Sequence, residues 1–315
     1  MYVITAIFKH KLDSIDEFLK LKKFLESLPI RIEQIKTLSK DRCYDFQISA
    51  LEPENNEDDS VLIAKLKQQL TPESIDLSVL VDLTLQKNDE LRKEKKLFCF
   101  DMDSTLIKQE VIELIASYAD VEDQVEAITS RAMNGELDFK QSLHERVALL
   151  KGIDSTNIWS ELKERLIFTP GDFELMKVLK AKGTKLAVLS GGFINLAEYV
   201  KETLNLDYAF ANQLEVDDKG ILTGNVLGEI VDGDKKAQLT LKIAEDNDID
   251  LQRVVCVGDG SNDLKMMGAV GFGVAWNAKP IVQQQAPSKL NTEKISDILY
   301  LLGYSDEEIE KLSSS

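Results

Sequence analysis

The chain has 315 residues, a formal net charge of −17 and an isoelectric point of about 4.7. That length is enough for a large hydrophobic core and for more than one folding unit. Nucleic-acid binding usually needs a basic face, so the acidic balance disfavours it and favours an enzyme that acts on a small molecule. No apolar run reaches the roughly 18 residues of a transmembrane helix, so we expect no membrane association.

The cysteines show no pattern typical of cross-links or metal binding. There are three, Cys43, Cys99 and Cys256, without Cys-x-x-Cys spacing. This odd number disfavours a disulfide framework or a structural zinc site. The first eight residues lack the cationic stretch and cleavage site of a signal peptide, so they are predicted to form a strand. We therefore expect a cytoplasmic protein.

Residues 1–85 are predicted to form one small domain. Apolar residues there follow strand and helix periodicities in the order βαββαβ, which is typical of the ferredoxin-like fold. The predicted strands cover 2–8, 31–38, 44–51 and 75–85, and the predicted helices cover 14–28 and 61–70. Residues 86–96 are densely charged and are predicted to be a solvated linker or an exposed helix between two domains.

From residue 97 onward, short apolar runs alternate with helix-length segments, which indicates a parallel α/β sheet. The runs lie at 97–100, 185–189, 253–257 and 271–275. Residues 108–167 are helical in pattern almost throughout and are predicted to be an inserted cap. The core is therefore assigned to 97–107 and 168–304, and residues 305–315 to a C-terminal tail.

Asp101 and Asp103 follow the apolar run at 97–100. Active sites of open α/β sheets lie at the carboxyl ends of the strands, and residues i and i+2 of an extended chain share a face. The two carboxylates could therefore meet one substrate, one as nucleophile and the other as acid or base. A calcium loop is excluded because its glycine and glutamate positions hold Leu106 and Ile112. A plain polar turn is the remaining alternative.

Three further segments carry residues suited to phosphate or metal. Ser190, Gly191 and Gly192 follow a strand and offer a hydroxyl and free amides to an anion, unless they form a plain strand-to-helix turn. Lys236 directly precedes a helical run and could reach a phosphate, although such a lysine is usually solvated. After the run at 253–257, a glycine-rich turn offers oxygen ligands that suit Mg²⁺, or else is a simple acidic turn. Its polar residues are Asp259, Asn262 and Asp263.

In this order the four segments resemble the motifs of the haloacid dehalogenase-like phosphatase superfamily, and within it the phosphoserine phosphatase family. The closer match rests on Phe100–Leu106 with Glu110, on Arg131–Gly135 with Phe139 and Arg146, and on Ser190–Phe193, Val231–Gly233 and Val257–Asp263. It covers about residues 97–304 and is most similar to fungal members. Residues 1–85 resemble only loosely the ACT-like region of longer members.

The resemblance implies a Rossmann-like parallel-sheet core with a helical cap, preceded by an ACT-like α+β domain. It implies that Asp101 is the nucleophile and forms an aspartyl phosphate, while Asp103 is the general acid and base. Mg²⁺ would be bound by Asp101, the backbone carbonyl of Asp103 and Asp259. The resemblance also implies that Ser190, the Gly191 N–H and Lys236 bind the phosphoryl oxygens. Asn262 would lie at the substrate, and Asn262 and Asp263 would orient the metal ligands and Lys236.

The implied substrate is O-phosphoserine. Arg146 would bind its carboxylate and Glu110 its ammonium, while Met133 and Phe139 would close an apolar lid. Without the resemblance, Met133 and Phe139 would be ordinary helix-core residues and Arg146 a surface charge. Another small phosphorylated metabolite, or phosphoryl transfer to an alcohol, is the alternative activity. For the N-terminal domain, dimerisation and binding of serine or another effector both remain open.

Overall fold

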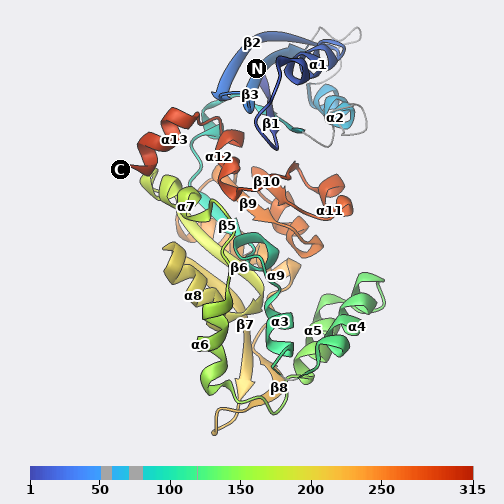
Figure 1. Cartoon of the computed structure of the whole chain (residues 1–315), viewed down its shortest axis with the longest axis vertical. Helices are drawn as coiled ribbons and strands as arrows, with labels where there is room; N and C mark the ends of the chain where they lie inside the picture. Colours follow the sequence, from blue (N-terminus) through green and yellow to red (C-terminus); the bar gives the residue numbers. More distant parts are fainter. Residues whose placement is uncertain (51–58, 71–80, 119, 315) are drawn as a thin grey trace.

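The computed structural model describes residues 1–50, 59–70, 81–118 and 120–314 (Figure 1). These residues form two sheets, one of four strands and one of seven. None of the described helices is both long and apolar enough to cross a membrane.

The smaller sheet is built from the N-terminal residues. Its strands have the order β2-β3-β1-β4 and every neighbouring pair is antiparallel, as the βαββαβ pattern predicts for a ferredoxin-like unit. The elements are β1 (Tyr2–Phe8), α1 (Ile15–Glu26), β2 (Ile30–Ser39), β3 (Cys43–Ala50), α2 (Asp59–Gln69) and β4 (Val81–Lys87). Residues 51 and 75–80, which were predicted to belong to strands, lie outside the described residues.

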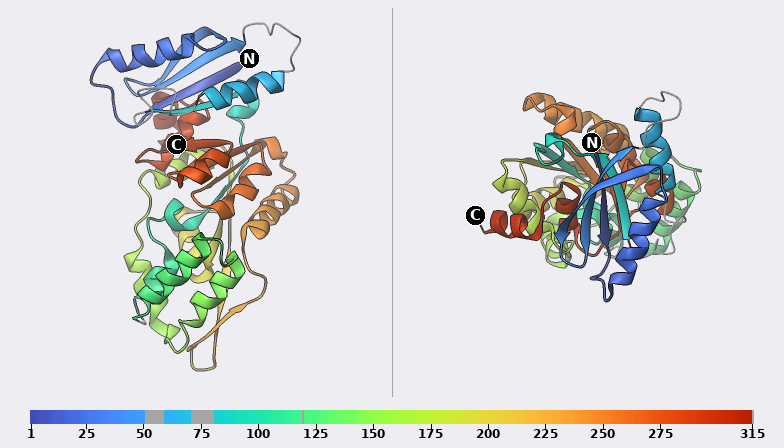
Figure 2. Two further views of the ribbon diagram at one scale, coloured as in Figure 1. Left: turned by 90° about the vertical axis from the view of Figure 1, so that its right-hand side faces the viewer. Right: turned by 90° about the horizontal axis from the view of Figure 1, so that it is seen from above.

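The two faces of this small sheet pack against different partners. Successive side chains of a strand point to opposite faces. Ile4, Ala6 and Phe8 of β1 belong to the core that the sheet shares with α1 and α2, whereas Ile7 belongs to the large core of the rest of the chain. Figure 2 shows the sheet lying over the C-terminal helices, so the N-terminal unit is docked on the part of the molecule that contains the larger sheet.

The larger sheet is parallel except at one edge, and the predicted α/β class is confirmed. Its strand order is β11-β10-β9-β5-β6-β7-β8, and only β8 runs antiparallel to its neighbour. The strands are β5 (Leu97–Phe100), β6 (Lys185–Phe193), β7 (Tyr208–Val216), β8 (Leu222–Leu227), β9 (Val254–Gly258), β10 (Phe272–Trp276) and β11 (Ser288–Leu290). The β7–β8 hairpin and β11 were not predicted from the sequence.

Helices cover both faces of this sheet, which explains why its central strands are continuously apolar. Phe98 and Phe100 of β5 face one layer with α7 and α8, while Leu97 and Cys99 face the other layer with α9 and α10. The helices are α7 (Asp172–Ala181), α8 (Ile194–Leu204), α9 (Gly233–Asp246), α10 (Leu264–Gly268), α11 (Pro280–Gln285), α12 (Ile298–Leu301) and α13 (Asp306–Ser313).

The segment between β5 and β6 is helical, as the pattern predicts. It contains α3 (Val111–Ala116), α4 (Glu122–Met133), α5 (Phe139–Ala148) and α6 (Ser155–Arg165). Helix α5 packs against α4 and against β8, and this pair of helices lies to one side of the sheet in Figure 1. Helices α3 and α6 contribute Ile115 and Leu162 to the large core.

Two segments differ from the sequence prediction. Residues 86–96 are not solvated throughout, because Arg92 is only 6% exposed and its guanidinium pairs with the buried carboxylate of Asp45 at 2.7 Å. Residues 305–315 are not a simple tail either. Ser305 and Glu308 form a capping box that starts α13, and Ile309 of this helix is buried.

Candidate active site

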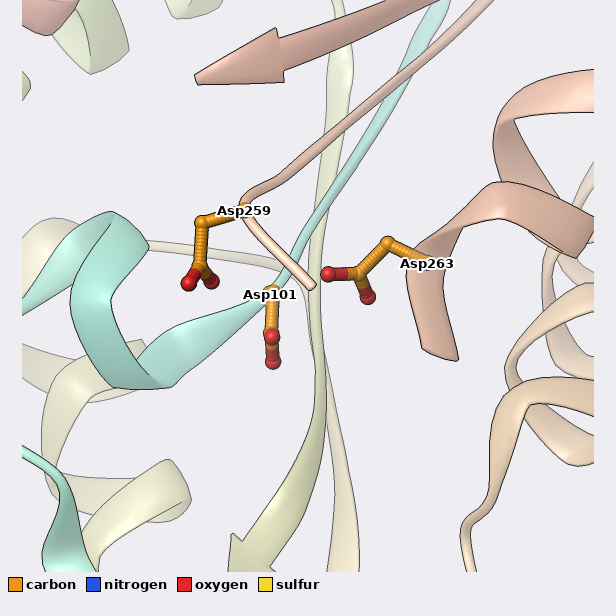
Figure 3. A group of neighbouring side chains, drawn as sticks. All are labelled: Asp101, Asp259 and Asp263. Carbon is orange, nitrogen blue, oxygen red and sulfur yellow. The ribbon is translucent and has the colours of Figure 1, made fainter. Parts of the chain in front are cut away.

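Three neighbouring strands end in polar residues at the same edge of the larger sheet. Asp101 follows β5, Ser190 lies near the end of β6, and Asp259 follows β9, and β5 is hydrogen-bonded to both other strands. Parallel strands bring their carboxyl ends together, so residues far apart in the sequence meet there. Figure 3 shows Asp101 lying between Asp259 and Asp263.

Asp101 is held by two donors on the same oxygen. Its Oδ1 lies 2.7 Å from the Met102 N–H and 2.7 Å from the Nζ of Lys236. Oδ2 has no hydrogen bond in the described part of the chain. One oxygen of the carboxylate is therefore fixed, and the other is left to face the cavity.

Lys236 is completely buried between two carboxylates. Its Nζ also contacts Asp263 Oδ1 at 2.7 Å. Burial opposes its charge, but Asp101 and Asp263 more than compensate, so the pKa of Lys236 lies above its ordinary value. The adjacent Lys235 instead pairs with Glu229 at the surface. Of the two lysines, only Lys236 reaches the carboxylates.

Asp101, Asp259 and Asp263 bring carboxylate oxygens within 4.8 Å of one another. Burial, followed by the charges of Asp101 and Glu110, raises the pKa of Asp259 to about 7. Three carboxylates face one ammonium here, and the surplus negative charge together with an all-oxygen donor set fits a hard divalent cation. Asp263 is already hydrogen-bonded on both oxygens, to Lys236 and to the Gly260 N–H, which leaves Asp101 and Asp259 better placed as ligands.

Gly258 makes room for this arrangement. A Cβ built at Gly258 would lie 2.3 Å from Asp263 Oδ2. Any larger residue at the end of β9 would therefore push the Asp263 carboxylate off Lys236.

Asp103 is placed to carry a proton. Its Oδ2 accepts the Val111 N–H at 3.0 Å, while Oδ1 is buried without a hydrogen-bonding partner in the described structure. Burial raises the pKa of Asp103 well above its usual range, and the charges of Glu110 and Asp101 raise it further. A carboxyl group with a raised pKa can donate a proton near neutral pH.

A turn at the end of β6 faces the two aspartates. Ser190 is fully buried, and its Oγ accepts the Gly192 N–H at 2.8 Å. Asn212 of β7, which sequence reasoning missed, holds this turn from behind. Its amide donates to the Gly191 carbonyl at 2.8 Å and accepts the Val231 N–H at 2.8 Å. The sequence carried no clear signal for Asn212, because β7 also contains the polar residues Gln213 and Glu215.

The inserted helices supply the opposite wall. Glu110 accepts the Ser104 hydroxyl at 2.7 Å, and burial is the main cause of its raised pKa. Arg146 is half-buried, and its Nε bonds the Ser142 carbonyl at 3.3 Å. Burial lowers the pKa of Arg146. Two of the donor groups on its guanidinium thus remain available toward the acidic side of the cavity.

Most of the predicted site residues line one cavity of about 650 Å³. They are Asp101, Asp103, Glu110, Phe139, Arg146, Ser190, Gly191, Asp259 and Asn262. Lys236 and Asp263 lie beneath its floor, where Lys236 contacts Asp101 and Asp263 contacts Lys236. Met133 ends α4, and its side chain lies outside the described part of the structure. His10 and His144 are both exposed and take no part in the cavity.

The comparisons with known proteins agree with this geometry. The model of the haloacid dehalogenase-like hydrolases matches residues 95–271. The chain therefore belongs to the haloacid dehalogenase-like hydrolase family. Within it the chain groups with the phosphoserine phosphatases and is a phosphatase: it is 54% identical to the phosphoserine phosphatase of Saccharomyces cerevisiae over 250 residues, 79% of this chain and 81% of that protein.

Two solved structures extend the comparison. A phosphoserine phosphatase carrying an analogue of the phospho-aspartyl intermediate is 43% identical, has a TM-score of 0.62, and covers 66% of this chain and 99% of its own. A haloacid dehalogenase family hydrolase from Salmonella enterica is 28% identical with a TM-score of 0.77, and covers 96% of this chain and 99% of its own. The second likeness therefore includes the N-terminal unit.

Proposed function

We propose that the protein hydrolyses O-phospho-L-serine to L-serine and phosphate, with Mg²⁺ as cofactor, as the last step of phosphorylated serine biosynthesis. The observation that carries the proposal is that one cavity holds both a nucleophile and groups suited to an amino acid. Asp101 and Asp103 lie in the same cavity as Glu110 and Arg146. A phosphoester, an ammonium and a carboxylate would each find a complementary partner there.

Asp101 acts as the nucleophile through Oδ2, because Oδ1 is already fixed by the Met102 N–H and Lys236. Attack on phosphorus forms an aspartyl phosphate and expels the serine oxygen. Asp103 protonates that oxygen as it leaves, and then accepts a proton from the water that hydrolyses the aspartyl phosphate. The raised pKa of Asp103 supports the first of these roles.

Two sets of groups stabilise the negative charge on the transferred phosphoryl group. Ser190, the Gly191 N–H and the Lys236 ammonium face its oxygens. Mg²⁺ would be held by Asp101, the Asp103 carbonyl and Asp259, and would supply positive charge that lets an anionic nucleophile approach an anionic phosphate. Asn262 and Asp263 orient this group of residues, and Asp263 does so through Lys236.

The amino-acid end of the substrate is recognised by the inserted helices. Arg146 binds the carboxylate with two parallel hydrogen bonds, and Glu110 binds the ammonium. Phe139 and Met133 form the apolar lid that excludes water. The ring of Phe139 already lies over Gly191, where a Cβ would be 2.8 Å from its Cζ. A different small phosphorylated metabolite is the alternative substrate, since the cavity of about 650 Å³ also admits larger phosphoesters.

A phosphate-release assay tests the proposal. Wild-type enzyme is assayed with phosphoserine, phosphoethanolamine and p-nitrophenyl phosphate, with Mg²⁺ and after chelation. We expect phosphoserine to be preferred by at least tenfold in kcat/KM, activity to need Mg²⁺, and Asp101→Asn to be inactive. Equal turnover of all three esters would contradict the substrate, and an active Asp101→Asn variant would contradict the mechanism.

We also propose a cytoplasmic location. All three cysteines, Cys43, Cys99 and Cys256, are buried and unpaired. Free thiols persist in reducing compartments, which supports this location. Fractionation of cells with an antibody against the protein would test it, and recovery from an oxidising compartment would contradict it.

A further inference from the structure

Helix α11 separates the catalytic cavity from the joint between the two units. Lys279, Ile281 and Val282, at the start of this helix, line the active-site cavity. Pro280 and Gln283 line a second cavity of about 620 Å³, which lies between α11 on one side and α2 and β4 of the N-terminal unit on the other. The position of one short helix therefore affects the mouth of the active site.

A chain of hydrogen bonds connects α11 to the N-terminal unit. Asp82 of β4 accepts the Asn291 main-chain N–H at 2.6 Å and the Asn291 amide at 3.0 Å. Asn291 and Gln283 exchange two side-chain hydrogen bonds, of 2.8 and 3.1 Å, and Gln283 donates a further bond of 2.6 Å to the Ala278 carbonyl. Both amide groups thus use both of their N–H hydrogens.

This connection matters because α11 has little other support in the described part of the chain. Val282 anchors it in a small apolar cluster with Ala275 and Ala278, and its opposite side faces the second cavity rather than a packed core. Asp82 is only 4% exposed, so its hydrogen bonds are made away from competing water. Buried and fully satisfied polar networks fix one arrangement of the elements that they join.

We propose that Asp82 and Asn291 are positioning residues for the active site. Acting through Gln283, they hold α11 and thereby set Lys279 and Ile281 at the mouth of the catalytic cavity. The N-terminal unit would then shape substrate entry without touching the substrate. The kinetic part of the inference rests on the proposed phosphoserine activity, whereas the position of α11 can be tested without it.

The kinetic test compares Asp82→Ala with Gln86→Ala. Gln86 lies on the same face of β4 and also bonds the catalytic part, but through the Leu301 carbonyl at 2.7 Å and away from α11. We expect Asp82→Ala to raise KM for phosphoserine about 5- to 10-fold, the equivalent of one buried hydrogen bond, with kcat within twofold of wild type. Gln86→Ala should change neither constant by more than twofold.

Amide hydrogen exchange provides a readout that needs no substrate. The Val282 and Gln283 amides bond the Lys279 carbonyl, and the Ala286 amide bonds the Val282 carbonyl. These amides should exchange about tenfold faster in Asp82→Ala and in Asn291→Ala than in wild type or Gln86→Ala. Asn291→Ala removes the side chain on the other side of the same hydrogen bonds, so it provides the test if Asp82→Ala fails to fold.

The outcomes separate the two proposals. Unchanged exchange in α11, or equal effects of Asp82→Ala and Gln86→Ala on KM and exchange, would overturn the positioning role. A wild-type enzyme that does not release phosphate from phosphoserine would overturn the proposed function, while the exchange measurement would still decide how α11 is held.

Discussion

Asp101 and Asp103 sit two residues apart but have different surroundings. Asp101 is bonded by a backbone N–H and by Lys236, whereas Asp103 faces Glu110 and has one oxygen without a partner in the described structure. Environment, rather than residue type, distinguishes the two carboxyl groups: burial raises the pKa of Asp103, whereas Asp101 lies against the Lys236 ammonium.

The difference between the two carboxyl groups predicts that Asp103→Asn impairs one substrate much more than another. Serine needs a proton to leave, whereas nitrophenolate is a much weaker base and does not. In the first turnover, release of serine from phosphoserine should fall about 10²- to 10⁴-fold, while the burst of nitrophenolate from p-nitrophenyl phosphate persists. Rapid-quench and stopped-flow measurements follow the two products. A nitrophenolate burst that is lost to the same degree as serine release would contradict the role of Asp103.

Asp172, at the start of α7, is a second unusual carboxyl group. It is 1% exposed, its Oδ2 has no partner in the described part of the chain, and burial raises its pKa to about 6. Because the folded pKa exceeds the unfolded one, the folded state favours the protonated form, and stability is lost as the pH rises from about 4 through 6.

Asp172→Asn should therefore raise the urea midpoint at pH 7.5 and change it little at pH 4.5. Glu174→Gln is the control, since it removes an exposed acid from the same first turn of α7. That control should be neutral or slightly destabilising at pH 7.5, because acids near a helix N-terminus are favourable. The prediction is wrong if Asp172→Asn lowers the midpoint at pH 7.5.

At the scale of single residues, the sequence predicted those site residues that lie at the end of an apolar strand. Asp101, Ser190 and Asp259 each come directly after or late in an apolar run, and parallel strands must gather such positions at one edge. Asn212 could not be predicted in this way. It lies within β7, and its two partners are backbone groups whose position only the folded sheet defines.

Among the elements, α5 closes over the active site through one close contact. The ring of Phe139, the first residue of α5, fills the space above Gly191 of β6. Glycine is needed there because any Cβ would meet the ring. The position of α5 over the active site therefore depends on residue 191 having no side chain.

Gly191→Ala should hold the cap away from the core and raise KM for phosphoserine several-fold. Combining it with Phe139→Leu should cost less than the sum of the single changes, since the shorter side chain leaves room for the new methyl group. Gly268→Ala is the control, because a Cβ there meets nothing within 4 Å. Additive effects of Gly191→Ala and Phe139→Leu, measured by steady-state kinetics, would argue against this contact.

The elements also show where pattern reading succeeds and where it fails. The alternation of strands and helices was predicted because burial on both faces makes the central strands continuously apolar. Helix α13 was missed although Ser305 and Glu308 have the spacing of a capping box, since residues 305–315 were assigned to a C-terminal tail. The β7–β8 hairpin was missed because its residues are only partly buried.

On the scale of the whole molecule, the two units are joined by buried charges. Arg92 bonds Asp45 and Thr5 of the small sheet and the Leu301 carbonyl of α12. Its neighbour Lys93 pairs with Glu308 at the surface, where both side chains are partly exposed. Adjacent residues thus make one buried and one solvated ion pair across the same joint.

Arg92→Met should destabilise the protein by about 3–5 kcal/mol, since it leaves the Asp45 carboxylate buried without its partner. Lys93→Met, the matched control, should cost at most about 1 kcal/mol, as expected for an exposed pair. Urea denaturation at neutral pH measures both. Similar losses of unfolding free energy in the two variants would contradict a larger contribution from the buried Arg92–Asp45 pair. Sequence reasoning could not find this pair, because Arg92 lies in a densely charged segment and its partner Asp45 lies 47 residues earlier, in β3.

The polar contacts of the joint also have a consequence for the nascent chain. Arg42 bonds Asp297, 255 residues later, and Arg92 bonds Leu301, 209 residues later. At synthesis rates of about 5–20 residues per second, the docking face of the small sheet would wait roughly 10–50 s on the ribosome for its partner. Its polar side chains, Thr5, Asp45 and Asp82, can remain hydrated during that interval, which reduces the apolar surface that would invite aggregation. Completion of the fold is thereby postponed until residues 297–301 have been synthesised.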